Sequence, residues 1–374
     1  MKIGIDASRS VSGGAIEHLK GILGRSFYKI ERIKKVYLWA PSSTLTKLPN
    51  YFWLEKISTD FLGKFILKKL FWQFFILPKV CKKLSINLLF NTDAGSLCSF
   101  KPSVTLLQDI IPFEKKIISK YKFYQISLYR NLILRFVFIK CLRNTNHIIF
   151  LSKYSKKVTS NYVKVQNYSI IPHGFDKYYS KIKFRKISEK KNYYINALYV
   201  SNALIYKNQW KVIEAISEIR KQHKINIKLK IVGGGSGAAL KKMNLSKHKF
   251  DKNNKYIKLC GFKKKNHIKK DYQNSHIFIF ASSCEAFGIT LLEAMSTGIP
   301  IACSNKSSLP EIIMNNTVYF NPENTQEIVN AIMKIVGNKY LRNKISIGAR
   351  NRSKLYTWKK SSKLTWQTLY KVCL

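Results

Sequence analysis

The strongest fold signal in this chain is the segment Ala281-Ser-Ser-Cys-Glu285-Ala-Phe-Gly288-Ile-Thr-Leu-Leu-Glu293-Ala-Met-Ser-Thr-Gly298-Ile-Pro300. An apolar run directly before it, residues 277–280, is short enough for a strand buried on both faces. The second half of the stretch has an apolar helical pattern that ends on glycine and proline. The loop between strand and helix therefore lies at the carboxyl end of a strand, where open parallel sheets bind their ligands.

Two carboxylates belong to this unit, Glu285 on the turn and Glu293 inside the helix. Placed there, they can bracket a polyhydroxylated ligand of the size of one sugar. Gly288 lets such a ligand approach the backbone without a side chain in the way. The free N–H groups at the helix start favour anions and hydroxyl oxygens.

Strands and helices alternate along the rest of the chain in the same way, beginning with a strand at residues 2–6. Residues 177–192 interrupt this alternation, because they are rich in lysine and lack a sustained apolar pattern. We therefore predict an α/β protein with two doubly wound domains, residues 1–176 and 193–356, joined by a linker at 177–192.

The composition is strongly basic, with 67 Lys and Arg against 19 Asp and Glu, a formal net charge of +48 over 374 residues. The basic residues are spread over both halves of the chain, which indicates a lysine-rich bias rather than a basic tail. Such a surface attracts polyanions, namely anionic bilayers or non-specifically bound nucleic acid. No nucleic-acid recognition motif is present, so no specific nucleic-acid partner is expected.

The seven cysteines include no Cys-x2-Cys pair, and their number is odd. This pattern favours neither a zinc site nor a disulfide framework and predicts a reducing compartment. The chain opens directly on a predicted strand rather than a signal peptide, and no apolar run is long enough to span a membrane. The expected location is cytoplasmic.

Two predicted helices, residues 61–78 and 121–142, combine aromatic and aliphatic side chains with lysine and arginine. In the first, Lys64, Lys68 and Gln73 are expected near one face, which suits a helix lying in a membrane interface. The alternative is a pair of ordinary core helices with their lysines in water. The interfacial interpretation predicts a protein held peripherally at the inner face of the cytoplasmic membrane.

The spacing Glu285-x7-Glu293 with Phe287-Gly288-Ile289 inside it closely resembles the donor-binding motif of the retaining, family 4 glycosyltransferases of GT-B fold. The resemblance extends over nearly the whole chain and is most specific from Val200 to Ile313. It implies two Rossmann-like, doubly wound domains facing a cleft, with the acceptor on the first and the nucleotide-sugar on the second. It also implies that a C-terminal helix at 357–374 completes the first domain.

The resemblance assigns residues to the donor site, on turns that follow strands of both domains. These are Gly13, Gly14, Ser201, Asn202, Lys207, Gly233, Phe262, Phe287, Gly288, Ile289 and Glu293. Lys207 stands where the family has a lysine that neutralises the donor diphosphate, whereas Ser201-Asn202 replace the usual Gly-Arg. His18 is expected to be a solvated helix residue, and His173 a hinge residue satisfied by backbone groups.

The expected catalytic residues are Glu285, Gln108 and Asp109. Gln108 replaces a histidine that contacts the donor sugar in many relatives, and glutamine cannot take up a proton at neutral pH. Asp109 is therefore expected only to position its neighbours. No Asp-x-Asp occurs in the sequence, so neither a metal nor another cofactor is expected.

The resemblance implies transfer of a sugar from a nucleotide-diphosphate sugar to an oligosaccharide or lipid-linked acceptor. The basic surface and the two aromatic helices favour an acceptor of bacterial surface polysaccharide, such as O-antigen, lipopolysaccharide or capsule. Two alternatives stay open: a nucleotide-sugar epimerase of the same fold, and a basic membrane- or nucleic-acid-binding homologue without catalysis.

Overall fold

The computed structural model describes residues 1–11, 13–24, 33–63, 65–121, 126–175, 178–182, 184, 186–187 and 193–374. The chain divides into two compact units: unit 1 contains Met1–Gly174 and Tyr356–Leu374, and unit 2 contains Phe175–Leu355. The division at Gly174 lies close to the domain boundary that the sequence analysis places after residue 176. Tyr179 and Ile182, which belong to the predicted linker, are buried inside unit 2.

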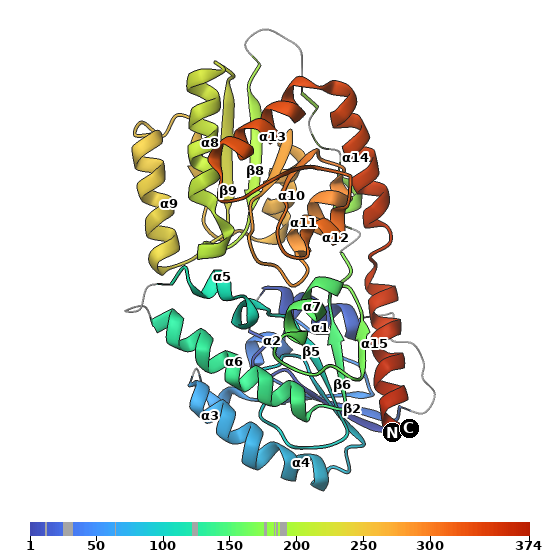
Figure 1. Ribbon diagram of the computed structural model, residues 1–374. Helices are drawn as coiled ribbons and strands as arrows, with labels where there is room; N and C mark the ends of the chain where they lie inside the picture. Colours follow the sequence, from blue (N-terminus) through green and yellow to red (C-terminus); the bar gives the residue numbers. More distant parts are fainter. Residues whose placement is uncertain are drawn as a thin grey trace. The chain divides into compact units, whose positions relative to one another are not determined.

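Unit 1 is built on a parallel sheet of seven strands in the order β3-β2-β1-β4-β5-β6-β7. The strands are β1 (Lys2–Asp6), β2 (Lys35–Ala40), β3 (Leu54–Ser58), β4 (Leu88–Asn91), β5 (Ser103–Leu107), β6 (His147–Phe150) and β7 (Tyr168–Ile170). The helices are α1 (Gly13–Leu23), α2 (Ser42–Leu45), α3 (Ile66–Phe71), the π-helix η2 (Trp72–Ile76), α4 (Leu77–Lys83), α5 (Lys115–Ile118), α6 (Ile126–Asn144), α7 (Lys153–Ser160) and α15 (Trp358–Cys373), with short 3₁₀ turns η1 (Asp60–Leu62) and η3 (Ile111–Phe113) (Figure 1).

Unit 2 repeats this plan with six parallel strands in the order β10-β9-β8-β11-β12-β13. The strands are β8 (Ile195–Val200), β9 (Ile227–Val232), β10 (Ile257–Leu259), β11 (Ile277–Phe280), β12 (Ile301–Ser304) and β13 (Val318–Phe320). The helices are α8 (Gln209–Gln222), α9 (Gly237–Phe250), α10 (Lys265–Gln273), α11 (Ile289–Thr297), α12 (Leu309–Ile313), α13 (Thr325–Gly337) and α14 (Lys339–Ser353), with 3₁₀ turns η4 (Tyr179–Lys181) and η5 (Ile205–Lys207).

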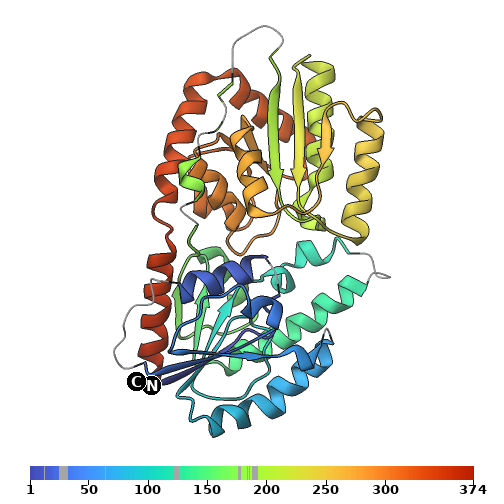
Figure 2. The same ribbon diagram turned by 180° about the vertical axis from the view of Figure 1, so that it is seen from behind.

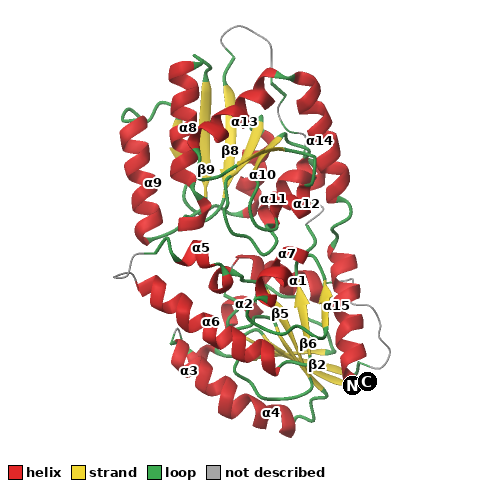
Figure 3. Cartoon of the chain, viewed as in Figure 1, coloured by secondary structure: helices red, strands yellow, loops and turns green. Residues whose placement is uncertain are grey.

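In both units the strand order reverses once, between β1 and β4 in unit 1 and between β8 and β11 in unit 2. Helices cover both faces of each sheet, as Figures 2 and 3 show. The central strands are accordingly buried along their whole length, for example Ile277 to Phe280 of β11. This confirms the prediction of an α/β protein with two doubly wound parallel sheets.

Two edge strands, β3 and β13, have no counterpart in the sequence analysis. Strand β3 reads Leu-Glu-Lys-Ile-Ser and is only partly buried, so it lacks the continuous apolar run of a central strand. Helices α9, α10 and α14 were also missed. Each is rich in lysine or arginine, which weakens the apolar stripe by which a helix is recognised.

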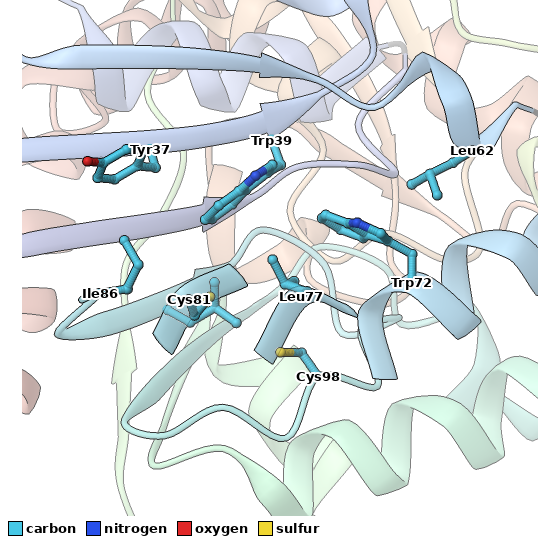
Figure 4. Close-up of a cluster of buried hydrophobic side chains, with 9 residues drawn as sticks. Tyr37, Trp39, Leu62, Trp72, Leu77, Cys81, Ile86 and Cys98 are labelled. Atoms are coloured by element: carbon cyan, nitrogen blue, oxygen red, sulfur yellow. The ribbon is translucent and has the colours of Figure 1, made fainter. Parts of the chain in front are cut away.

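A buried aromatic cluster attaches the segment α3–η2–α4 to the sheet of unit 1. Trp72 is 3% exposed and its ring centroid lies 6.5 Å from that of Trp39 on β2, while Leu77 and Cys81 fill the space beside them (Figure 4). The next residue, Gln73, donates a hydrogen bond of 2.7 Å from its Nε2 to Asp6 Oδ2 at the end of β1. Gln73 is 1% exposed whereas Lys68 is exposed, so the prediction that both lie near one face of the helix is wrong. Lys64 lies outside the described residues.

The last helix, α15, packs on α1 although almost the whole chain separates them. The indole N–H of Trp366 donates to the backbone oxygen of Ile22 at 2.8 Å, and the Ser362 hydroxyl donates to the same oxygen at 3.1 Å. Gly21 permits the close approach, because a Cβ there would lie 2.1 Å from the ring of Trp358. The C-terminal helix is therefore part of the core of unit 1.

Two histidines meet inside unit 1. His18 of α1 and His173 lie with their Nδ1 atoms 3.2 Å apart, next to the ring of Trp358, and both are almost fully buried. The expectation of a solvated His18 is therefore wrong. Burial lowers the pKa of His18 to about 3, and burial together with the nearby His18 lowers the pKa of His173 well below its usual range. Both rings are neutral at pH 7.

We predict that replacing Trp366 with alanine lowers the free energy of unfolding by about 3–5 kcal/mol, because a fully buried ring and its hydrogen bond to Ile22 are lost. Urea unfolding followed by circular dichroism measures the change. The matched control is Tyr340→Ala, whose ring is 77% exposed and whose loss changes stability by less than about 0.5 kcal/mol. Equal stability of the two variants would contradict the packing of α15 described above.

We also predict that stability falls on acidification through the pair of buried histidines. Their unfolded-state pKa, near 6.5, exceeds the folded value of about 3 for His18, so unfolding takes up protons below pH 6.5. Between pH 6.5 and its folded pKa, each histidine therefore lowers the free energy of unfolding by up to about 1.4 kcal/mol per pH unit of acidification. Above pH 6.5 this loss of stability does not occur.

Urea titrations at pH 7.5, 6.5 and 5.5 measure this slope. The double variant His18→Gln/His173→Asn is expected to lose it, whereas His223→Gln, at an exposed position, keeps it. An unchanged slope in the double variant would show that other groups cause the acid sensitivity.

Candidate functional site

An ion pair stands at the point of unit 2 where the strand order reverses. Lys207 lies at the end of η5, in the connection that follows β8, and Glu285 lies in the turn that follows β11. The two strands are neighbours in the sheet, so their carboxyl ends bring together residues that are 78 positions apart. Lys207 Nζ forms a short ion pair with Glu285 Oε1, and the two side chains are only 11% and 14% exposed. This is the position at which doubly wound sheets bind ligands.

The backbone of Glu285 is fixed by two serines that precede α12. Its N–H donates to Ser307 Oγ at 2.8 Å, and its carbonyl oxygen accepts from the hydroxyls of Ser307 at 2.7 Å and Ser308 at 2.9 Å. Ser307 adopts a φ of +62°, a conformation that side chains seldom adopt. The carboxylate thus starts from a rigid backbone and needs little reordering to act on a ligand.

Lys207 is held by its neighbours in the chain and by aromatic rings. Tyr199 O–H donates to its carbonyl oxygen at 2.5 Å, and its ammonium lies 5.1 Å from the ring centroid of Tyr206 and 5.5 Å from that of Phe280. Asn208, in the left-handed region at φ +52°, turns the chain into α8 and donates to the carbonyl oxygen of Ala281 at 2.9 Å. Asn208 therefore ties the loop after β8 to the residue that directly follows β11.

Glycines shape the neighbouring turn after β9. Gly233 has a φ of +142°, and a Cβ there would lie 2.0 Å from the backbone oxygen of Ser201. Only glycine fits this approach. The carbonyl oxygen of Asn202 accepts a hydrogen bond from Gln209 at 2.8 Å, and the Ser201 hydroxyl donates to the same oxygen at 2.9 Å. Phe262, on the adjacent turn after β10, exposes 82% of its surface.

The remaining donor residues of unit 2 occupy α11 and the turn before it. Gly288 is the N-cap of α11 with φ +89°, Phe287 is 3% exposed, and Ile289 begins the helix. Glu293 is half-buried one turn further on. Burial, and then the negative charge of Glu293, raise the pKa of Tyr272 well above its usual range.

The residues predicted in unit 1 lie at the carboxyl edge of its own sheet. Gln108 follows β5 and donates from Nε2 to the carbonyl oxygen of Thr92 at 2.8 Å. Asp109 accepts from the N–H of Ile111 at 2.9 Å, and burial raises its pKa to about 6. Gly13 and Gly14 open α1; a Cβ at Gly13, where φ is +58°, would meet no atom within 4 Å. Roles in catalysis and donor binding stay predictions for all of these residues.

Several residues of these two edges were missed by the sequence analysis. Asn208, Ser307 and Ser308 position the ion pair, and Arg9 forms an ion pair of 3.3 Å with Asp93 in unit 1. A serine pair before Leu309-Pro310 indicates a helix start. The sequence does not reveal that this serine pair forms hydrogen bonds with Glu285, because the contact arises from the pairing of β11 with β12 in the sheet.

Within the described residues, no group of three or more His, Cys, Asp or Glu side chains is arranged to hold a metal ion.

Comparison with known proteins shows what the part of the chain around this site resembles. Residues 180–352 match the family model described as glycosyl transferases group 1. This part of the chain is similar to that family. The match includes the ion pair, the glycine turns and α11, so it confirms the resemblance seen in the motif around Glu285.

Several known proteins are similar to this chain. The chain is 27% identical over 103 residues to the O-antigen chain mannosyltransferase B of Escherichia coli, which is 28% of this chain and 27% of that protein. Among solved structures, sucrose-phosphate synthase from Thermosynechococcus elongatus superposes with a TM-score of 0.73 at 13% identity, over 100% of this chain and 99% of the other. Anabaena Alr3699/HepE, solved with UDP and glucose, gives 0.72 at 17% identity over 99% of both chains. The fold is thus that of the GT-B glycosyltransferases, as predicted.

We predict that the ion pair between Lys207 and Glu285 is strongly coupled. Lys207→Met leaves a mostly buried carboxylate without its cation and lowers the free energy of unfolding by about 3 kcal/mol. The double variant Lys207→Met/Glu285→Leu is destabilised by less than the sum of the single variants, because no buried charge is left over.

A double-mutant cycle by urea unfolding measures the coupling. The pair Lys211–Glu214 on α8, with side chains 32% and 37% exposed, is the matched control, and its coupling stays below about 0.5 kcal/mol. Additive effects at Lys207 and Glu285 would mean that the pair is not formed in solution.

Proposed function

We propose that this chain is a retaining glycosyltransferase that moves a sugar from a nucleotide-diphosphate sugar to a glycan or lipid-linked glycan acceptor. The observation that carries the proposal is the ion pair between Lys207 and Glu285 at the switch point of a glycosyl transferases group 1 domain. It presents a cation and a carboxylate from two adjacent loops. A glycosyl donor needs both, one for the leaving diphosphate and one for the sugar.

In the proposed reaction, the bond between the anomeric carbon and the diphosphate oxygen breaks, and the nucleoside diphosphate leaves with the electron pair. The acceptor hydroxyl forms the new bond to the anomeric carbon and releases its proton. Lys207 offsets the negative charge that grows on the leaving group, together with N–H groups at helix starts such as that of α11. Glu285 orients the sugar hydroxyls and stabilises positive charge at the anomeric carbon, and Glu293 binds the nucleotide ribose.

The turns after β8, β9 and β10 are proposed to bind the rest of the donor. Gly233 and Phe262 border the nucleobase, while Ser201 and Asn202 donate neutral hydrogen bonds where the family has an arginine. Phe287, Gly288 and Ile289 shape the loop around the sugar. Gln108 and Asp109 of unit 1 are proposed to take part in catalysis, and Gly13 and Gly14 in donor binding.

The transfer is proposed to need no metal, because the sequence lacks Asp-x-Asp and Lys207 supplies positive charge at the diphosphate. The similarity to an O-antigen chain mannosyltransferase supports an acceptor of bacterial surface polysaccharide. The complex of HepE with UDP supports a uridine nucleotide among the donors to test first.

No helix in the described part of the chain combines the length and apolarity needed to cross a bilayer. We propose that the protein works in the cytoplasm, held peripherally at the inner face of the membrane.

The purified chain, in EDTA and without added metal, is expected to release one nucleoside diphosphate from a panel of UDP-, GDP- and dTDP-sugars only when a lipid-linked acceptor extract is present. Glu285→Gln is expected to reduce kcat by about 10²–10³-fold, because stabilisation of the transition state is lost. The control Lys241→Ala, on the exposed side of α9, keeps full activity. Product release is followed by chromatography of the nucleotides.

Three outcomes would contradict the proposal in different ways. Conversion of the sugar nucleotide without acceptor would establish the epimerase. Restoration of activity only by a divalent cation would refute metal independence. Full activity of Glu285→Gln would remove that residue from the mechanism.

A further inference from the structure

Unit 1 exposes a large number of apolar side chains on two helical segments. On the first, running from residue 65 to the end of η2, the exposed fraction ranges from 41% for Phe74 to 77% for Leu67. On α6 it ranges from 42% for Leu132 to 85% for Ile126. We call these residues the α3–α6 face: Phe65, Ile66, Leu67, Phe71, Phe74, Phe75, Ile76, Ile126, Tyr129, Leu132, Ile133 and Phe136. A contiguous apolar surface of this kind marks an interaction site.

The core side of the first segment is already occupied. Trp72 packs on Trp39, and Gln73 binds Asp6, so the inward positions of η2 are filled. The π-turn at Trp72–Ile76 sends these two residues inward and leaves Phe71, Phe74 and Phe75 outside. The outward aromatic side chains therefore have no place in the core of unit 1.

Helix α6 shows the same division. Its buried residues include Leu134, Phe138 and Cys141, whereas Ile126, Tyr129, Ile133 and Phe136 recur at helical spacing on the opposite side. The helix is apolar on both sides. One apolar side of α6 packs on the core of unit 1, and the other apolar side is exposed and available to a binding partner.

The two segments form one surface. Lys140 of α6 places its ammonium 5.5 Å from the ring centroid of Phe74 on η2. Figures 1 and 2, from opposite sides, both show α6 running next to α3 and α4. The aromatic side chains of both segments can therefore contact the same binding partner at the same time.

The charged residues on these two segments all have one sign. Neither residues 61–92 nor residues 115–175 contain an Asp or Glu, whereas lysines and arginines accompany the apolar side chains on both segments. Lys68, Arg130, Lys140 and Arg143 are exposed, and the ammonium of Lys68 lies 5.4 Å from the Phe65 ring. A second copy of this chain would bring equal charges together, so self-association through this face is disfavoured. The complementary partner is apolar inside and anionic at its rim.

We propose that the α3–α6 face is a membrane-docking surface, which inserts its aromatic and aliphatic side chains at the boundary between headgroups and acyl chains of an anionic bilayer. Both segments then lie in the interface plane, and the lysines and arginines contact lipid phosphates. The proposal rests on and deepens the proposed function, since it brings unit 1, where the family resemblance places the acceptor, to the surface that carries lipid-linked acceptors. Binding itself needs neither donor nor turnover.

Sedimentation of the full chain with vesicles tests this surface. At physiological salt the protein is expected to bind vesicles of phosphatidylcholine with about one third phosphatidylglycerol, and to bind pure phosphatidylcholine at least tenfold more weakly. The variants Phe71→Ser/Phe75→Ser and Ile133→Ser/Phe136→Ser each reduce binding at least tenfold. Lys68→Glu/Lys140→Glu removes the preference for the anionic lipid.

The matched controls change similar side chains in unit 2. Leu245→Ser/Tyr340→Ser alters side chains 60% and 77% exposed, and Lys241→Glu/Lys247→Glu reverses two charges; both variants bind as the unchanged protein does. All substituted positions of the α3–α6 face are exposed, so unfolding curves of its variants stay the same and report intact folding.

A direct readout comes from Phe71→Trp, whose fluorescence shifts to the blue on vesicle binding and is quenched by brominated acyl chains. Absence of quenching, or equal binding by the variants of the α3–α6 face and the controls, would overturn the proposal. A concentration-dependent dimer that those variants abolish would assign the face to a second copy instead. Glu285→Gln binds vesicles normally, so loss of turnover and loss of docking are separate results.

Discussion

Parallel strands that are buried on both faces impose the constraint on which this structure depends. Every connection between such strands must cross from one end of the sheet to the other, so helices cover both faces and all carboxyl ends lie along one edge. Where the strand order reverses, two neighbouring loops depart to opposite faces and leave room between them. In unit 2 that place lies between β8 and β11, and it holds Lys207 and Glu285.

The site is rigid because its loops are tied to each other rather than only to their own strands. Asn208 reaches the carbonyl oxygen of Ala281, and Ser307 and Ser308 hold the backbone of Glu285. These bonds connect the loops after β8, β11 and β12. A carboxylate and an ammonium with little exposure are thereby kept in place before any ligand arrives, which lowers the cost of ordering them during the reaction.

Unit 1 uses its covering helices in a different way. Its core is closed by α15, which returns from the far end of the chain to pack Trp366 against α1, and by the neutral pair of His18 and His173 beside Trp358. With the core complete, the outer sides of α3, η2 and α6 carry apolar residues that packing does not require. Exposing them to water is unfavourable, so their presence together with lysine and arginine indicates a second environment.

Features that depend on neighbouring residues in the chain could be predicted from the amino-acid sequence. Apolar runs and helical periodicity located the central strands of both sheets, and Gly288, Gly298 and Pro300 defined the limits of α11. The same signals failed at the edge strand β3, whose polar residues face water, and in the lysine-rich helices α9, α10 and α14. Apolar patterns therefore fail to predict strands and helices that are only partly buried.

Contacts between residues far apart in the chain could not be predicted from the sequence. The motif placed Glu285 on a turn, but its pairing with Lys207 follows from the adjacency of β8 and β11, which no local pattern encodes. The inward direction of Gln73 depends on the π-turn, and the burial of His18 depends on α15, which lies at the other end of the sequence. Local propensity is set within a few residues, whereas strand order and the return of a terminal helix are set by the packing of the whole core.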